Sequence, residues 1–122
     1  MDGTGNPDRM LPRIYGAALA AAADLQAAAR AAEQAMIADA AGAQRSIPPI
    51  AKAILAAMRD KPSQPFAALP ALERETLALA RLGGYKVPEI AAALGEDERT
   101  IRRRLLDGLT AMRARPTLAF DA

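Results

Sequence analysis

The chain has 122 residues, a formal net charge of +2, and neither cysteine nor histidine. These absences exclude thiol nucleophiles, imidazole bases, disulfides and nearly every zinc or transition-metal site, so we expect no metal, no cofactor and no enzymatic activity. Hydrophobic residues make up 52% of the chain, but 32 residues are alanine and only 3% are aromatic. A composition rich in alanine and poor in β-branched residues favours helix over strand, and we therefore predict an all-α fold with a thin core.

The sequence shows no sign of a membrane segment or of a secretory leader. No stretch reaches the roughly 18 apolar residues of a membrane span. Asp2 and Asp8 precede the first apolar run, where a secretory signal would be cationic. We therefore expect a cytoplasmic protein with no membrane partner.

Apolar residues spaced three and four apart predict three helices in the first half of the chain. The first covers about residues 11–23, and Asp24 is a suitable N-cap for a second helix that ends near Gly42. The third covers about residues 48–60, and we predict that residues 1–60 form a small N-terminal helical unit. The apolar stripes of the second and third helices comprise Leu25, Ala28, Ala29, Ala32 and Met36, and then Ile47, Ile50, Ile54 and Met58.

Residues 61–65 interrupt this pattern with two prolines in five positions, and we predict a linker or a hinge there. Beyond it we expect helices over about residues 70–82, 88–94 and 98–113, in a C-terminal domain of residues 66–115. In the first of these helices the residues expected to face inward are Leu72, Thr76 and Leu79.

Residues 87–106 have the pattern of a helix-turn-helix motif. Gly95 permits the positive φ that the tight turn requires, and Ala91 is small where two helices must approach closely. Ile101 follows six residues after the glycine as the apolar anchor of the second helix. Glu96 departs from the pattern, because the position after the turn glycine is usually apolar in such motifs. A motif of this kind places its second helix in the major groove of DNA.

The second helix of this motif has a basic outer face, since residues 99–115 carry six arginines against a single acid, Asp107. At about 100° per residue, apolar residues fall on one side of the helix and arginines on the other. The apolar stripe comprises Ile101, Leu105, Gly108, Leu109 and Met112, and the basic face Arg99, Arg102, Arg103 and Arg113. Such a face suits contacts with phosphates and base edges. The alternative is a solvated basic face balanced by the acidic residues Glu73, Glu75 and Glu89, and the turn before the helix favours the first interpretation.

Several short motifs occur in order between residues 66 and 114. They are Leu69-Pro70 before an arginine-containing helix, a bend at Gly83-Gly84, Glu89-Ile90-Ala91 followed by Leu94-Gly95, and Thr100-Ile101 followed by Arg104-Leu105. Together they resemble region 4 of bacterial extracytoplasmic-function sigma factors. This resemblance implies a domain that reads the −35 promoter element and docks on the flap of the RNA polymerase β subunit.

The resemblance also implies which residues bind DNA. By position they are Lys86, Arg99, Thr100, Arg102, Arg103 and Arg104. Arg102 and Arg103 are the predicted base readers, because both lie in the first two turns of the helix and opposite its apolar stripe. Arg104 matches an arginine of the family, and Lys86 would lie near the DNA backbone. Asp107-Gly108 stands where the family usually has Arg-Ala.

The N-terminal half resembles region 2 of the same sigma factors less closely. Residues 15–19 and 32–36 look like parts of its first two helices, whereas Ala28-Ala29-Arg30 stands where the family has an acidic Ala-Glu-Asp. Opening a promoter requires bases held on aromatic platforms, and residues 16–65 contain no aromatic residue. The resemblance therefore implies a shortened region 2, and it supports DNA recognition without autonomous promoter melting.

Two functions remain open from the sequence. The first is a sigma-like transcription factor that binds double-stranded promoter DNA and RNA polymerase. The second is a shortened sigma-like interaction module that binds RNA polymerase or an anti-sigma protein without sequence-specific DNA recognition. A steep loss of affinity with rising salt would identify the DNA binder. An enzyme is disfavoured, because neighbouring carboxylates such as Glu73 and Glu75 are typical of solvated helix faces and helix ends.

Overall fold

The computed structural model describes residues 7–42 and 47–113. Within these ranges the chain forms α-helices and one short 3-10 helix, and no β-strand, which confirms the all-α prediction. In chain order the elements are α1 (Pro7–Ala21), α2 (Leu25–Ala40), α3 (Pro49–Asp60), the 3-10 helix η1 (Phe66–Ala68), α4 (Ala71–Gly83), α5 (Val87–Leu94) and α6 (Glu98–Arg113). None of these helices is both long enough and apolar enough to cross a membrane. Residues 114 and 115, at the predicted end of the C-terminal domain, lie outside the described residues.

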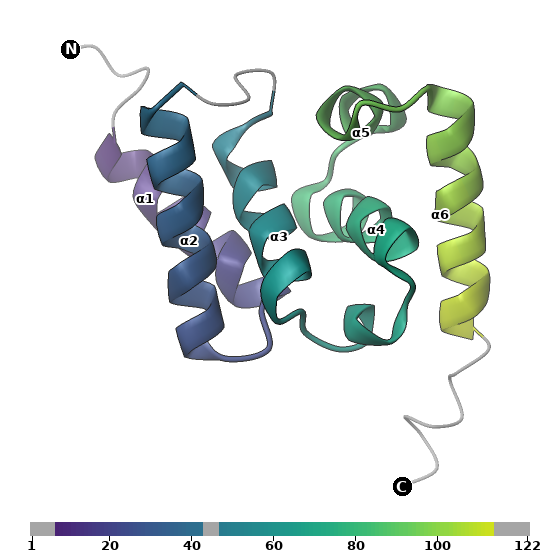
Figure 1. The fold of residues 1–122 in the computed structure, drawn as a ribbon, viewed down its shortest axis with the longest axis horizontal. Helices are drawn as coiled ribbons and strands as arrows, with labels where there is room; N and C mark the ends of the chain where they lie inside the picture. Colours follow the sequence, from purple (N-terminus) through teal and green to yellow (C-terminus); the bar gives the residue numbers. More distant parts are fainter. Residues whose placement is uncertain (1–6, 43–46, 114–122) are drawn as a thin grey trace, which may run out of the picture.

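Helix α3 occupies the centre of the molecule (Figure 1). It packs against α1 and α2 on one side and against α4 on the other. Helix α6 packs against α4 and α5 and lies at the end of the molecule opposite α1 and α2 (Figure 1). One side of α6 is therefore covered by its own domain, and the other side faces outward.

Alanine supplies the buried face of α2. Its buried residues are Ala27, Ala28, Ala31, Ala32 and Ala35. The predicted inward positions of Leu25 and Met36 are wrong, because these side chains are 69% and 39% exposed, and Ala29 is exposed as well. An all-alanine face lets α2 approach α1 and α3 closely, and a large side chain on that face would hold the helices apart. Of the stripe predicted for the third helix, Ile54 and Met58 are buried within α3, Ile47 is buried just before it, and Ile50 is half-buried.

In α4, Thr76 and Leu79 are buried as predicted, whereas the inward prediction for Leu72 is wrong. Leu72 is 54% exposed in the first turn of the helix, whereas the buried residues of α4 begin at Thr76. The buried hydroxyl of Thr76 donates a hydrogen bond of 2.8 Å to the Leu72 carbonyl, so its burial leaves no unpaired donor.

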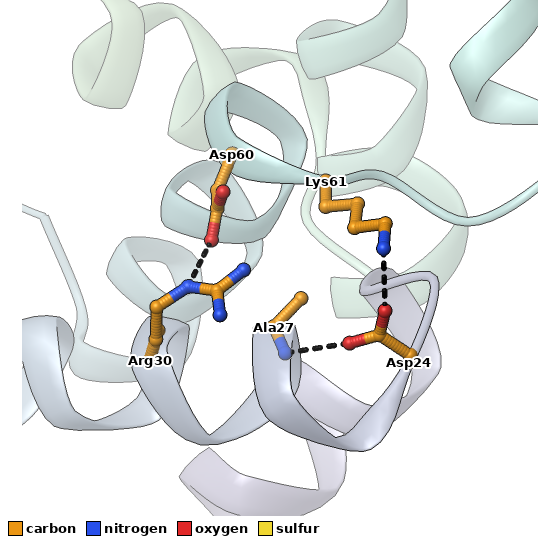
Figure 2. Close-up of polar contacts among 5 residues, drawn as sticks. All are labelled: Asp24, Ala27, Arg30, Asp60 and Lys61. Atoms are coloured by element: carbon orange, nitrogen blue, oxygen red, sulfur yellow. Dashed lines mark hydrogen bonds and ion pairs between the residues drawn. The ribbon is translucent and has the colours of Figure 1, made fainter.

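Residues 61–65 are hydrogen-bonded to the connection between α1 and α2. The backbone N–H of Ala23 donates to the Lys61 carbonyl at 2.8 Å, and that of Ser63 donates to the Ala21 carbonyl at 2.7 Å. The Lys61 ammonium also donates to Asp24 at 2.7 Å (Figure 2). The two prolines alone are compatible with either a linker or a hinge. These hydrogen bonds favour a linker that is fixed in place.

Charged side chains connect the three central helices. Arg30 of α2 donates to Asp60 at the end of α3 at 2.9 Å (Figure 2). Arg59 of α3 donates two hydrogen bonds to Glu75 of α4, at 2.8 and 3.0 Å. The paired geometry raises the pKa of the Arg59 guanidinium above its ordinary value. Helices α2, α3 and α4 are thus joined by polar contacts as well as by the apolar core.

The Arg74 guanidinium makes a denser connection between α4 and the segment before it. It donates to the carbonyl oxygens of Leu69 at 2.8 Å, Phe66 at 3.2 Å and Met58 at 3.3 Å. These acceptors lie before α4, in η1 and in the last turns of α3. A single side chain therefore anchors the start of the C-terminal domain to the central helix.

The bend between α4 and α5 requires two glycines for different reasons. Gly84 has a φ of +69°, which favours glycine. Gly83 has no such φ, but a Cβ atom there would collide with the ring of Tyr85. Partial burial raises the pKa of the Tyr85 phenol above its ordinary value. The predicted helix stop is thus also a packing site for Tyr85.

We expect acid to weaken the start of α2. Hydrogen bonds from the Lys61 ammonium and from the Ala27 backbone N–H hold the pKa of Asp24 below its ordinary value. Since the folded pKa is depressed, the stabilisation is fully present above the unfolded pKa of about 4 and is lost as pH falls through the folded value. The melting temperature of Asp24→Asn should therefore fall less than that of wild type between pH 5 and pH 3. Asparagine retains an N-cap acceptor, so this comparison isolates the charge. Parallel curves for the two proteins would contradict the prediction.

Candidate nucleic-acid interface

Helices α5 and α6 are joined by the tight turn that the sequence predicts. Gly95 adopts a φ of +67°, and the Glu96 backbone N–H donates to the Ala91 carbonyl at 3.0 Å. Ile90 and Ile101, one from each helix, are fully buried. The structure therefore has the helix-turn-helix geometry, with α6 as its second helix.

Asp97 caps α6. Its Oδ1 accepts a hydrogen bond of 2.7 Å from the backbone N–H of Thr100. This bond is the main reason that the pKa of Asp97 lies below its ordinary value, so the cap is charged at neutral pH. Asp97 is therefore the N-cap residue of α6. The cap fixes where the first turn of α6 begins, and hence which side chains that turn presents.

Three of the six residues implied to bind DNA lie exposed on the first two turns of α6: Arg99, Arg102 and Arg103. Arg102 has 61% of its side chain exposed and lies 3.3 Å from Glu98, one turn earlier, whose side chain is also exposed. An exposed pair of this kind contributes little stability, so Arg102 can exchange Glu98 for another anion. Thr100 is half-buried, and its backbone N–H serves the cap.

Arg104 does not join this exposed group. Only 14% of its side chain is exposed, and its Nη2 lies 3.2 Å from a carboxylate oxygen of Glu96. Three residues after Ile101, it lies about 60° from that buried position around the helix, on the flank of the apolar stripe. The structure thus places Arg104 beside the turn and away from the outer face.

Lys86 is exposed and lies immediately before α5, at the end of that helix farther from the turn. Its backbone N–H donates to Glu89 at 2.8 Å, which secures the start of α5. Lys86 is therefore separated from the turn by the length of α5, about 12 Å for eight residues. This position suits a contact with the DNA backbone that is separate from the contacts expected of α6.

Two features of the surface were not assigned from the sequence. Glu96 and Glu98 each pair with an arginine of α6, although the sequence marks Glu96 only as an unusual residue after the turn. The i, i+4 spacing of Glu98 and Arg102 is a signal that could have revealed their pair. The pair of Glu96 and Arg104 crosses the end of the turn, and no simple spacing rule indicates it.

Leu106 is 65% exposed and follows the exposed arginines on the outer part of α6. Asp107 is exposed beside it. The strongly basic part of the outer surface is therefore the first two turns of α6. Farther along the helix the exposed surface is mixed, with Leu106 and Asp107 followed by Arg113 in the last turn.

Comparison with known proteins agrees with this geometry. Residues 66–112 match the family model of sigma-70, region 4. No curated protein and no solved structure matches the chain. The matched segment contains η1, α4, α5 and nearly all of α6, including the turn and the exposed arginines. Residues 66–112 of this chain are therefore a sigma-70 region 4 domain.

Proposed function

We propose that this chain is a sigma-like transcription factor that recognises promoter DNA of the −35 type through α6 and docks on the β flap of RNA polymerase. The observation that carries the proposal is the exposed group Arg99, Arg102 and Arg103 on the first two turns of a capped second helix. The N-terminal residues of such a helix are those that reach base edges in the major groove. The match of residues 66–112 to sigma-70 region 4 supports both binding partners.

The same proposal covers the rest of the molecule. Residues 1–60 act as a shortened region 2 of the extracytoplasmic-function type, residues 61–65 as a linker, and residues 66–115 as the DNA-binding domain. The protein acts in the cytoplasm, without enzymatic activity, and recognises the promoter without opening it alone. The absence of aromatic residues from positions 16–65 supports this last point.

A second function is favoured by a different surface. Leu11, Tyr15 and Leu19 form one stripe along α1 and are 44%, 38% and 41% exposed. Exposed apolar residues gathered in this way are typical of protein-binding surfaces. The alternative is therefore an interaction module that binds RNA polymerase or an anti-sigma protein, without sequence-specific recognition of DNA.

We expect Arg102→Ala and Arg103→Ala each to weaken binding to the preferred duplex by about 1–3 kcal/mol and to change its base preference. The measurement is fluorescence anisotropy of the full chain against a duplex library at fixed salt, with a salt series on the best duplex. Arg30→Gln is the matched control, because it removes an exposed arginine from α2, at the other end of the molecule.

Lys86→Ala should weaken all sequences about equally, as expected for a contact with the DNA backbone. If Arg102→Ala and Arg103→Ala lose affinity without any change in base preference, these side chains only hold phosphates. If neither variant loses affinity, recognition through α6 is wrong and the interaction module takes its place.

A further inference from the structure

We propose that the ion pair of Glu96 and Arg104 fixes the orientation of α6 relative to the turn. Arg104 then serves DNA recognition as a positioning residue and not as a DNA ligand. This inference rests on the proposed function. It gives a role to the two residues near the turn that the DNA-binding surface does not use. It also replaces the role that the family resemblance implies for Arg104.

The first argument is the direction and burial of Arg104. Its side chain is 14% exposed, against 61% for Arg102 on the outer face of the same helix. Its Nη2 lies 3.2 Å from Oε2 of Glu96. To reach a DNA phosphate, the guanidinium would have to leave this partner and the flank of the apolar stripe. Leaving Glu96 without its partner beside the turn would oppose that movement.

The second argument is the position of Glu96. This residue follows the turn glycine, where such motifs usually have an apolar anchor. Its backbone is fixed at the end of α5 by the hydrogen bond from its N–H to the Ala91 carbonyl, at 3.0 Å. Its side chain is 39% exposed and faces Arg104, eight residues later. An ion pair here takes the place of the apolar contact.

A hydrogen-bonded ion pair has a preferred direction, which an apolar contact lacks. The pair connects the end of α5 to the second turn of α6, and Asp97 fixes the start of α6 between them. Together these contacts set how far α6 rotates and tilts relative to α5. That orientation decides which bases Arg102 and Arg103 can reach.

The third argument is electrostatic. The charge of Arg104 is compensated by Glu96 within the protein, so Arg104 should release no counterion from DNA. The pair of Glu98 and Arg102 differs, because both side chains are exposed and lie on one helix. That pair can open when DNA binds. The salt dependence of binding should therefore come from Arg99, Arg102 and Arg103, and not from Arg104.

The test compares Glu96→Gln, Arg104→Gln and the swapped double variant (Glu96→Arg with Arg104→Glu) in the full chain. Arg103→Gln is the control for an exposed arginine, and Glu98→Gln the control for loss of a neighbouring carboxylate. Each protein is titrated with the duplex that wild type selects from a library and with a scrambled duplex, over a salt series. Far-UV circular dichroism establishes whether each variant is folded. If Arg104→Gln is unfolded, Glu96→Gln still tests the role of the pair.

We expect Glu96→Gln and Arg104→Gln each to reduce the discrimination between the two duplexes roughly tenfold, within the range of coupling inside one ion-pair network. The slope of log Kd against log salt should stay at the wild-type value in both, whereas Arg103→Gln should reduce it by about 1. The swapped variant should recover part of the discrimination. Glu98→Gln should keep both the salt slope and the discrimination of wild type.

Three results would overturn the inference. If Arg104→Gln reduces the salt slope by about 1 while Glu96→Gln leaves discrimination intact, Arg104 is a phosphate ligand. If both variants lose affinity equally for the two duplexes, the pair has only a structural role. If wild type itself shows no salt-dependent DNA binding, the proposed function fails and the positioning role fails with it; this outcome is recognised from the wild-type titration alone.

Discussion

Replacing Ile101 with aspartate is expected to unfold the C-terminal domain and to remove any DNA binding with it. Ile101 is 0% exposed and anchors α6 within the helix-turn-helix. Placing a carboxylate there without a partner costs several kcal/mol. The whole stability of a small domain is only about 5–15 kcal/mol, and a thin, alanine-rich core lies toward the lower end of that range.

Leu106→Asp provides the matched control. It makes the same chemical change on the same helix, but Leu106 is 65% exposed, so stability should change by no more than about 0.5 kcal/mol. Thermal unfolding followed by circular dichroism compares the two variants. A melting temperature of Ile101→Asp within a few degrees of wild type would show that the helix-turn-helix does not depend on this anchor.

The helix ends were predictable because their signals are local. Asp24 and Asp97 each accept a backbone N–H three residues later, and Gly95 adopts the positive φ that the turn demands. Each of these interactions spans at most a few residues, so the sequence contains all of its participants.

The buried face of each helix was less predictable. Leu25, Met36 and Leu72 are large apolar residues at helical spacing, yet they are exposed. In α2 the alanines are buried instead, because close packing between helices depends on the shapes of the neighbouring helices. Periodicity indicates that a helix has an apolar side, but it ranks residues by hydrophobicity. It therefore favours leucine where the packing requires alanine.

The residues of the candidate site also differ in how far the sequence predicts their positions. Arg99, Arg102 and Arg103 were placed by helical periodicity from Ile101, and they are exposed as that geometry requires. Arg104 was assigned by family position alone, and its pairing with Glu96 depends on how the turn folds. Arg74 has no sequence signal for its role, because its three carbonyl acceptors lie 5, 8 and 16 residues away.

Arg74→Ala is expected to destabilise the protein by about 1.5–3 kcal/mol, the range for hydrogen bonds that involve a charged group. For a chain of this size such a loss lowers the melting temperature by roughly 10 °C. Arg81→Ala is the matched control, because Arg81 lies exposed on the same helix and its loss should have little effect. Equal melting temperatures for the two variants would contradict the anchoring role of Arg74.

The same variant tests whether residues 61–65 are fixed or act as a hinge. Arg74 bonds to the Met58 carbonyl before this segment and to the Phe66 carbonyl after it, so it bridges the segment from both sides. In wild type we expect a protease to cut residues 61–65 no faster than the helix centres. In Arg74→Ala the cut should move to this segment, because its hydrogen bonds to the connection between α1 and α2 then hold it without the Arg74 bridge. Rapid cutting there in wild type would show instead that the two halves move about a hinge, and that α6 is carried by a domain that can reorient against α1–α3.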